Sequence, residues 1–262
     1  MSIYINDVLR DVESAINSCL NQSVKPDSIY LVLDGPVKED IKDYLSLLPS
    51  FCHVIPLANN VGLGAALNCG LTHVREDLVF RMDSDDISRL DRIEKSIDYF
   101  RRNPKCDILG GVISEFKEDL GDSARLRVVP ITSPTILKQM RFSSPLNHVS
   151  VCFRRASLPI APYTEKYIRL EDYSTWYKLY KLGLSFANIS DVLVDVKLGE
   201  NFLSKRKGWV TFHSFRNLYA NMMEDGFISP FQFVVFTVIR FVQYCVLPKF
   251  LLHRLYSWSR KN

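Results

Sequence analysis

The chain has 262 residues, which is enough for one large hydrophobic core or for one main domain with an appended piece. Its hydrophobic fraction of 47% and charged fraction of 24% are ordinary for a folded protein. The formal net charge of +4 is too small to indicate a nucleic-acid-binding protein, and we expect no nucleic-acid partner. The six cysteines lack metal-ligand spacing and no secretory signal is seen, which together predict a cytoplasmic protein with reduced thiols.

The first half of the chain alternates between helix and strand patterns. Apolar residues at Val8, Val12, Ile16 and Leu20 form one stripe and predict a helix over residues 7–21. Further helices are predicted over 41–48, 62–73 and 93–102, separated by strands over 28–33, 52–57, 77–82 and 106–112. This alternation favours an α/β fold with a mainly parallel sheet flanked by helices.

The pattern is looser after about residue 115. Strands are predicted over 125–129, 149–153 and 192–196, and helices over 134–140 and 171–182, the last ending at Gly183. The remaining residues are expected to be helical. We therefore divide the chain into a main domain over 1–200 and a helical C-terminal extension over 201–262.

An acidic cluster, Asp83-Ser84-Asp85-Asp86, follows the apolar run that ends at Phe80. Carboxylates at the carboxyl end of a buried strand lie where open α/β sheets bind ligands, and their oxygens suit Mg²⁺ or Mn²⁺ beside phosphates. The alternative is helix capping, which we expect of Asp86 or Ser88. A calcium loop is excluded because its fifth and sixth positions would be Ile87 and Ser88. A metal site requires Asp83 and Asp85 to face a cavity without arginine or lysine partners.

Two other polar groups follow predicted strands, and all three groups are expected at the same sheet edge. Asp34, before Gly35, is suited to a nucleoside hydrogen bond, but an Asp-Gly turn without a ligand is equally compatible with the pattern. Asn60 and Gly62 precede the next helix. The glycines there lack the third position of a dinucleotide fingerprint, and no phosphate-binding GxxxxGK[ST] loop is present.

Three candidates lie in the second half of the chain. Glu171 and Asp172 begin a predicted helix, where acids are favoured by the helix dipole or where a carboxylate can act as a general base. His148 is a lone histidine in a polar loop. Arg206, within Lys205-Arg206-Lys207, is either part of a solvated face or a ligand for a diphosphate.

The chain resembles glycosyltransferase family 2, which has the GT-A nucleotide-diphospho-sugar transferase fold. It is most similar to the bacterial type that builds capsular, exopolysaccharide or lipopolysaccharide sugars, including amylovoran. The resemblance covers most of the chain and rests on the order and spacing of several short segments. These segments are 18–23, 33–36, 59–68, 81–86, 147–148 and 171–173.

The resemblance implies a role for each matched residue. Asp34 would contact the base, with Asn60 and Gly62 also on the nucleotide-sugar. Asp83 would contact the ribose or donor sugar, and Asp85, with Asp83, would hold Mn²⁺ or Mg²⁺. Asp172 would deprotonate the acceptor hydroxyl beside Glu171, His148 would lie near the acceptor, and Arg206 would approach the diphosphate. The expected partners are a nucleotide-sugar donor, in particular a UDP-sugar, and a saccharide or lipid-linked saccharide acceptor.

Three features depart from the family pattern. Residues 1–4 match only the end of the hydrophobic strand with which members usually begin, and an unpaired neighbour strand would expose buried backbone groups at a cost of about 1–3 kcal/mol each. The usual acidic pair of the base-binding turn is Leu33-Asp34 here. The Q/RxxRW element is missing, and 205–209 is only a partial substitute.

The segment 231–247 is strongly apolar, but Arg240 and two glutamines interrupt it and Pro248 ends it, so we do not expect it to span a membrane. From Arg240 onward the chain has four further Lys or Arg residues and no acid. Such a segment suits either peripheral contact with an anionic inner-membrane surface or a helix packed on the main domain.

Two rival functions follow from the same residues. A binding or assembly subunit could keep this fold without catalysis, since its first strand is short. A sugar nucleotidyltransferase also uses acidic metal ligands after a strand, but it would release diphosphate, whereas a glycosyltransferase would release a nucleoside diphosphate.

Overall fold

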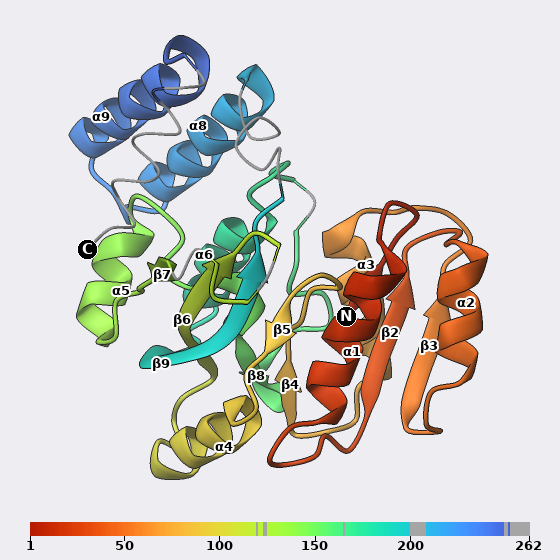
Figure 1. Cartoon of the computed structure of the whole chain (residues 1–262). Helices are drawn as coiled ribbons and strands as arrows, with labels where there is room; N and C mark the ends of the chain where they lie inside the picture. The colour runs from red at the N-terminus through yellow and green to blue at the C-terminus, as the bar shows by residue number, and fades with distance from the viewer. Residues whose placement is uncertain (119, 123–124, 165, 200–207, 249–250, 252–262) are drawn as a thin grey trace.

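A computed structural model describes residues 1–118, 120–122, 125–164, 166–199, 208–248 and 251. Its strands form two separate sheets with helices packed around them (Figure 1). The predicted α/β architecture is confirmed. Every strand and helix expected before residue 115 is present within a few residues of its predicted bounds.

The first sheet is parallel and has the order β1-β2-β3. Its strands are β1 (Ser2–Ile3), β2 (Ile29–Leu33) and β3 (Cys52–Pro56). The helices connecting this half are α1 (Leu9–Leu20), α2 (Glu39–Ser46) and α3 (Leu63–His73). β1 is a stub that pairs over two positions, with Ile3 opposite Leu33, and the Met1 ammonium extends the pairing by donating to Tyr30 O at 2.9 Å.

The second sheet is mixed, so the expectation of a mainly parallel sheet holds only for the first half of the chain. Its order is β4-β8-β6-β9-β5, with β7 beside β6, and only β6 and β9 run parallel. The strands are β4 (Leu78–Phe80), β5 (Ile87–Ser88), β6 (Ile108–Phe116), β7 (Arg125–Arg127), β8 (Cys152–Arg154) and β9 (Phe186–Lys197). The helices are α4 (Arg92–Arg102), α5 (Ser133–Met140), α6 (Glu171–Lys181) and the short turns η1 (His148–Ser150) and η2 (Arg155–Ser157).

β2 and β4 face each other across the gap between the two sheets without forming a ladder. A cavity of about 660 Å³ lies there, lined from the two sides by residues such as Tyr30, Val32, Leu78 and Phe80, with Met1 at its margin. The two-residue β1 does not fill this space. The sheets are therefore joined mainly by side chains, for example through Ser18 of α1, whose hydroxyl accepts the Ser88 N–H at 2.9 Å.

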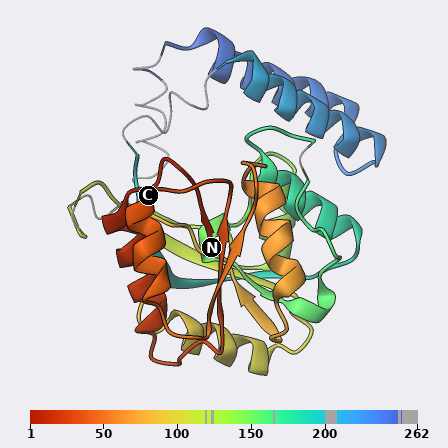
Figure 2. The same ribbon diagram turned by 90° about the vertical axis from the view of Figure 1, so that its right-hand side faces the viewer.

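The C-terminal region is helical, as predicted, with α8 (Trp209–Glu224), α9 (Pro230–Phe241) and the π-helical turn η3 (Val242–Val246). Figure 2 shows α8 and α9 lying together across one side of the molecule. Phe215, Leu218 and Met222 of α8 belong to the same buried cluster as Trp176 of α6. The extension therefore shares the main core, and the boundary drawn at residue 200 lies in a stretch outside the described residues.

Among the described residues, no helix combines the length and apolarity needed to cross a bilayer. All six cysteines are free thiols, as expected from their scattered positions.

Candidate functional site

The loops after β2 and β3 meet at one sheet edge, as the sequence predicts. The Asp34 side chain is buried, and its two oxygens accept the Val61 N–H at 2.6 Å and the Gly62 N–H at 3.1 Å. The Asn60 amide donates back to Asp34 O at 3.2 Å. Gly35 has φ +83°, and a Cβ there would lie 2.7 Å from the Asn60 nitrogen, so only glycine allows the two loops to approach so closely.

Asp34 thus fixes the turn that begins α3 in this structure. A carboxylate has about four acceptor positions, so each oxygen keeps one for a ligand after binding one N–H. The two interpretations of Asp34, turn-forming residue and nucleotide ligand, are therefore compatible with each other.

The acidic cluster follows β4 and is only partly as expected. Asp83 forms an ion pair with Arg81, whose side chain is 3% exposed against 36% for Asp83. Asp85 is exposed and makes no ion pair with another described residue. Of the two carboxylates predicted to lack a basic partner, only Asp85 meets that condition.

A third carboxylate, Asp7, lies beside this cluster. Desolvation, then the charges of Asp83 and Asp7, raise the pKa of Asp85 to about 6. Burial is also the largest cause of the raised pKa of Asp7, and Asp83 adds to it. The three carboxylates are therefore close enough to repel one another, and a bound cation would offset this repulsion.

Asp86 does not cap the next helix, contrary to the capping expectation. Its buried carboxylate accepts the Lys197 N–H at 2.9 Å and so ties the acidic cluster to the end of β9. Burial, together with Asp83 and Asp85, raises the pKa of Asp86 well above its usual range. The residue preceding α4 is Asp91, so Ser88 is not a cap either.

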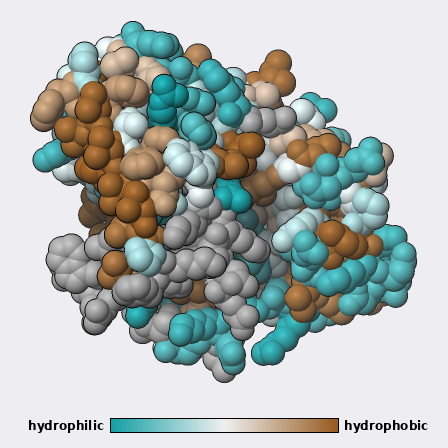
Figure 3. Space-filling model, turned by 90° about the horizontal axis from the view of Figure 1, so that it is seen from above, coloured by the Kyte–Doolittle hydropathy of each residue, from teal (hydrophilic) through white to brown (hydrophobic). Residues whose placement is uncertain are grey.

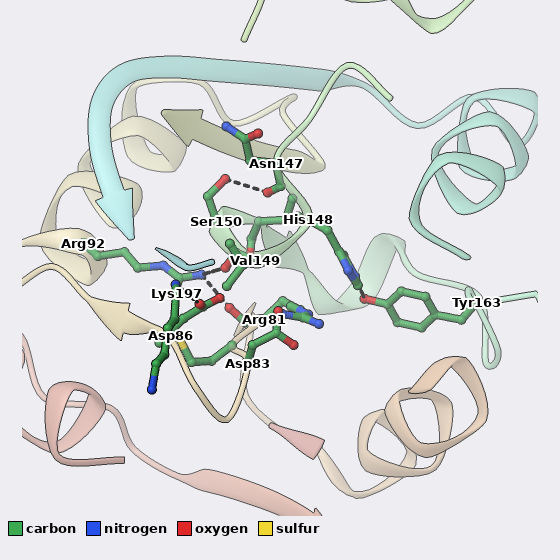
Figure 4. A network of polar contacts seen from close by, with 12 residues as sticks. Arg81, Asp83, Asp86, Arg92, Asn147, His148, Val149, Ser150, Tyr163 and Lys197 are labelled. Carbon is green, nitrogen blue, oxygen red and sulfur yellow. Dashed lines mark hydrogen bonds and ion pairs between the residues drawn. The ribbon is translucent and has the colours of Figure 1, made fainter. Parts of the chain in front are cut away.

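Arg92 connects the acidic cluster to the loop that carries His148 (Figure 4). Its buried guanidinium donates to Arg81 O at 2.7 Å and to Val149 O at 2.9 Å, and it lies 5.6 Å from the Phe80 ring centroid. Burial lowers the pKa of Arg92 to about 10, which leaves it charged at neutral pH. Arg92 thereby fixes the position of two segments of the site.

His148 lies in an aromatic setting rather than in the polar loop that the sequence suggests. Its Nε2 is 3.0 Å from the Tyr163 hydroxyl, and its ring packs edge-on against Tyr163 and Trp176 at centroid distances of 5.5 and 5.7 Å. Burial, with a smaller contribution from Arg81, lowers the pKa of His148 well below its usual value. The imidazole is therefore neutral at physiological pH and serves as a hydrogen-bonding group rather than a cation.

Glu171 and Asp172 form the first turn of α6, as predicted. The turn follows Arg169, which has an unusual positive φ of 68° and donates its N–H to Glu171 Oε1 at 2.9 Å. A Cβ on Gly64 of α3 would lie 4.0 Å from Glu171 Cγ and 3.6 Å from Tyr163 Cβ. The first turns of α3 and α6 are therefore close neighbours.

Tyr163 connects these groups electrostatically. Burial raises the pKa of its hydroxyl above the usual range; Arg81 opposes this shift, and the carboxylates of Asp83 and Asp172 add to it. Figure 4 shows Arg81, Asp83, His148 and Tyr163 close to one another. The structure thus brings the acidic cluster, the His148 loop and the start of α6 into one site.

One predicted residue, Arg206, lies outside the described residues. The residues missed by the sequence analysis are Asp7, Arg81, Tyr163 and Trp176. Asp7 could have been found from the sequence, because it comes after β1 much as Asp34 comes after β2. Arg81 could also have been found, because it lies two residues before Asp83, and residues two apart in an extended backbone point to the same side. The two aromatic residues had no local signal.

The donor set fits an open site for a hard cation. In the described part of the chain, no group of three or more His, Cys, Asp or Glu side chains could hold a metal by itself. Mg²⁺ and Mn²⁺ are commonly held by one or two carboxylates together with substrate phosphates and water. Asp85 provides one such carboxylate, whereas Asp83 does not meet the condition set by the sequence, because Arg81 is paired with it.

The arrangement, a parallel sheet in the first half of the chain and a mixed sheet in the second, is that of the GT-A fold. S. aureus TarS 1-349 in complex with UDP-GlcNAc shares this fold, with a TM-score of 0.68 at 15% identity, over 93% of this chain and 72% of that one. The mannosyltransferase PcManGT from Pyrobaculum calidifontis, in complex with GDP-Man and Mn²⁺, has a TM-score of 0.62 at 14% identity, over 100% of this chain and 74% of that one.

Residues 4–158 match the family described as Glycosyl transferase family 2, and the chain belongs to that family. It is 33% identical over 270 residues to the amylovoran biosynthesis glycosyltransferase AmsE of Erwinia amylovora, covering 100% of this chain and 98% of the relative. It is 34% identical over 215 residues to the UDP-Gal:alpha-D-GlcNAc-diphosphoundecaprenol beta-1,3-galactosyltransferase of Escherichia coli, covering 81% and 77%. The chain is therefore a family 2 glycosyltransferase.

Proposed function

We propose that this glycosyltransferase moves a sugar from a UDP-sugar to a saccharide or lipid-linked saccharide during synthesis of a cell-surface polysaccharide, with inversion at the anomeric carbon. The names of the E. amylovora and E. coli relatives support the polysaccharide setting and the lipid-linked acceptor. The donor class is supported by the E. coli relative and by the UDP-GlcNAc complex of TarS. The proposed setting is the cytoplasmic face of the membrane.

The observation that supports the proposal is the grouping of Asp83, His148 and the first turn of α6 near Tyr163. The turn held by Asp34 leads into α3, whose Gly64 also lies close to Tyr163. The turn held by Asp34 is suited to the nucleoside, the acids Asp83 and Asp85 to the diphosphate and its cation, and Asp172 to the acceptor. This order follows the length of a nucleotide-sugar, from base to anomeric carbon.

The reaction places negative charge on the departing diphosphate and positive charge on the anomeric carbon. Asp85 would hold a divalent cation, which would supply positive charge to stabilise the departing diphosphate. Arg81, buried and paired with Asp83, keeps that carboxylate oriented beside the donor. Asp172 accepts the proton of the acceptor hydroxyl as the oxygen attacks from the face opposite the diphosphate, and a single displacement gives inversion.

Neutral His148 and the Tyr163 hydroxyl form a hydrogen-bonding pair next to this reaction centre. Both groups carry no charge at neutral pH, because burial shifts the two pKa values away from neutrality. They are suited to orient sugar hydroxyls on the acceptor side without competing with Asp172 for its proton.

The test is transfer by purified protein from a panel of UDP-sugars in Mn²⁺, with release of UDP and the anomeric configuration of the product measured. We expect Asp85→Asn to abolish the transfer that depends on Mn²⁺, because the proposed metal ligand is lost. Asp172→Asn should lower kcat about 10²–10⁴-fold while nucleotide binding is retained, which is the range for loss of a general base. Asp43→Asn, an exposed acid on α2, is the control that should leave both unchanged.

The alternative functions give different results in the same experiment. Nucleotide binding without transfer or donor hydrolysis, for every sugar tested, would identify a binding or assembly subunit. Release of diphosphate from a nucleoside triphosphate and a sugar phosphate would identify a nucleotidyltransferase.

A further inference from the structure

The outward face of α9 is an apolar stripe with no charged side chain. Phe231, Val234 and Val238 of α9 recur every three or four residues, and they are 77%, 56% and 55% exposed. Val242 and Val246 of η3 continue the same spacing. Trp209 and Val210 at the start of α8 are also exposed. Figure 3 shows this apolar band along one side of the face seen from above. A contiguous exposed apolar band of this kind marks an interaction surface.

The inner face of α9 is firmly held, so the stripe cannot turn inward. The Arg240 guanidinium lies between the rings of Phe142 and Phe215, 4.1 and 4.3 Å from their centroids. It donates to Phe142 O at 2.7 Å and to the Tyr219 hydroxyl at 3.1 Å. Because Arg240 is the sole charged residue of α9 and is buried, it adds no charge to the outer face.

The sequence that follows the stripe is basic. From residue 242 to the last residue the chain has Lys249, Arg254, Arg260 and Lys261 and no aspartate or glutamate. An apolar stripe followed in sequence by a basic segment complements a lipid surface with anionic head groups. A protein partner would require a complementary apolar groove, and nothing in this charge distribution favours one.

We propose that the α9 stripe docks on an anionic lipid bilayer. Figures 1 and 2 show the α8–α9 pair on the side of the molecule toward which β2 points, the edge at which Asp34 lies. Docking there turns the proposed site toward the membrane. The biological reason for membrane docking rests on the proposed function, in which the acceptor is lipid-linked. Lipid binding itself does not require catalysis.

The experiment is co-sedimentation of the full chain with vesicles of phosphatidylcholine alone or with one third phosphatidylglycerol. The test variant is Val234→Asp with Val238→Asp. The control is Leu47→Asp with Ile160→Asp, which adds the same charge at two exposed apolar residues outside α9, both 82% exposed. Because all four residues are well exposed, folding should be maintained in both variants, and circular dichroism checks this.

We expect the wild-type protein and the control to bind the anionic vesicles, more weakly in high salt. The α9 variant should bind roughly tenfold or more weakly, since two carboxylates would have to enter the apolar boundary. Absence of wild-type binding, or equal binding by the α9 variant, would overturn the proposal. It would also be overturned if the wild-type protein is a dimer that the α9 variant converts to a monomer, because the stripe would then cover a second copy.

Transfer to a water-soluble acceptor, measured on the same samples, separates this proposal from the proposed function. The α9 variant should keep that activity at the wild-type level. Loss of vesicle binding with transfer intact is the result expected of a docking surface, whereas vesicle binding by a wild-type protein without transfer would refute the enzyme function alone.

Discussion

Replacing Asp34 by asparagine separates its two roles. The substitution keeps the shape of the side chain but leaves one oxygen acceptor, and the new amide NH₂ faces a backbone N–H. In the wild-type structure, both oxygens accept N–H groups, from Val61 at 2.6 Å and from Gly62 at 3.1 Å. The turn before α3 should therefore be destabilised whether or not a nucleotide is present.

The magnitude follows from the number and kind of these hydrogen bonds. Each of the two hydrogen bonds to the buried carboxylate contributes about 1.5–3 kcal/mol, and one neutral bond of about 1 kcal/mol is retained, so we expect Asp34→Asn to cost about 2–5 kcal/mol. With an unfolding entropy of roughly 2.1 cal/mol/K per residue, a chain of this length loses about 4–9 °C in Tm.

Differential scanning calorimetry measures the Tm, and isothermal titration with UDP measures nucleotide binding. The control is Asp40→Asn, since Asp40 also accepts a backbone N–H, from Ile41 at 2.8 Å, but is exposed, and its loss should be below about 0.5 kcal/mol. An Asp34→Asn protein with wild-type Tm would refute the structural role argued here. If that protein also lost UDP binding, Asp34 would act on the nucleotide alone.

Three further changes test other parts of the site. Arg92→Met should cost about 3 kcal/mol by denaturant unfolding, because two backbone acceptors lose a charged donor, and an unchanged midpoint would contradict this. Because the pKa of His148 is lowered on folding, the native state binds fewer protons than the unfolded state below about pH 6.5. Wild-type stability should therefore fall below that pH by up to about 1.4 kcal/mol per unit, and His148→Phe should flatten this slope in denaturation curves between pH 5 and 7.5; equal slopes would count against the buried neutral imidazole. Gly35→Ala should lower the Tm more than Gly183→Ala, since both glycines have positive φ but only Gly35 meets a neighbouring backbone within 3 Å; equal losses would exclude the close approach of the two loops.

The first half of the fold was predictable because each strand there is a short apolar run between turn residues. The second half was less so. β9 begins at Phe186, well before the predicted start at 192. The prediction missed this start because the polar Asn188 interrupts the apolar pattern. In the structure Asn188 is buried and donates hydrogen bonds to Pro130 O and Pro145 O. A polar residue satisfied by distant carbonyls cannot be recognised from its neighbours in sequence.

The site was predictable to the extent that it consists of strand ends and helix starts. Asp34 and Asp85 follow predicted strands and Asp172 begins a predicted helix, so their positions could be recognised from the sequence. The ion pair of Arg81 with Asp83 is a tertiary detail of loop conformation, and it narrowed the expected metal ligands. The environment of His148 depends on Tyr163 and Trp176, which come from other elements and meet it only in the folded chain.

The position of the site relative to the gap between β2 and β4 has a mechanical consequence. Asp34 follows β2 of the first sheet and Asp85 follows β4 of the second, and among the described residues no strand ladder joins these sheets. A donor that contacts both residues would link the two sheets, so binding should reduce the motion of one sheet relative to the other. Catalytic alignment and rigidity would then be supplied by the substrate itself, and the empty protein would keep the freedom to admit it.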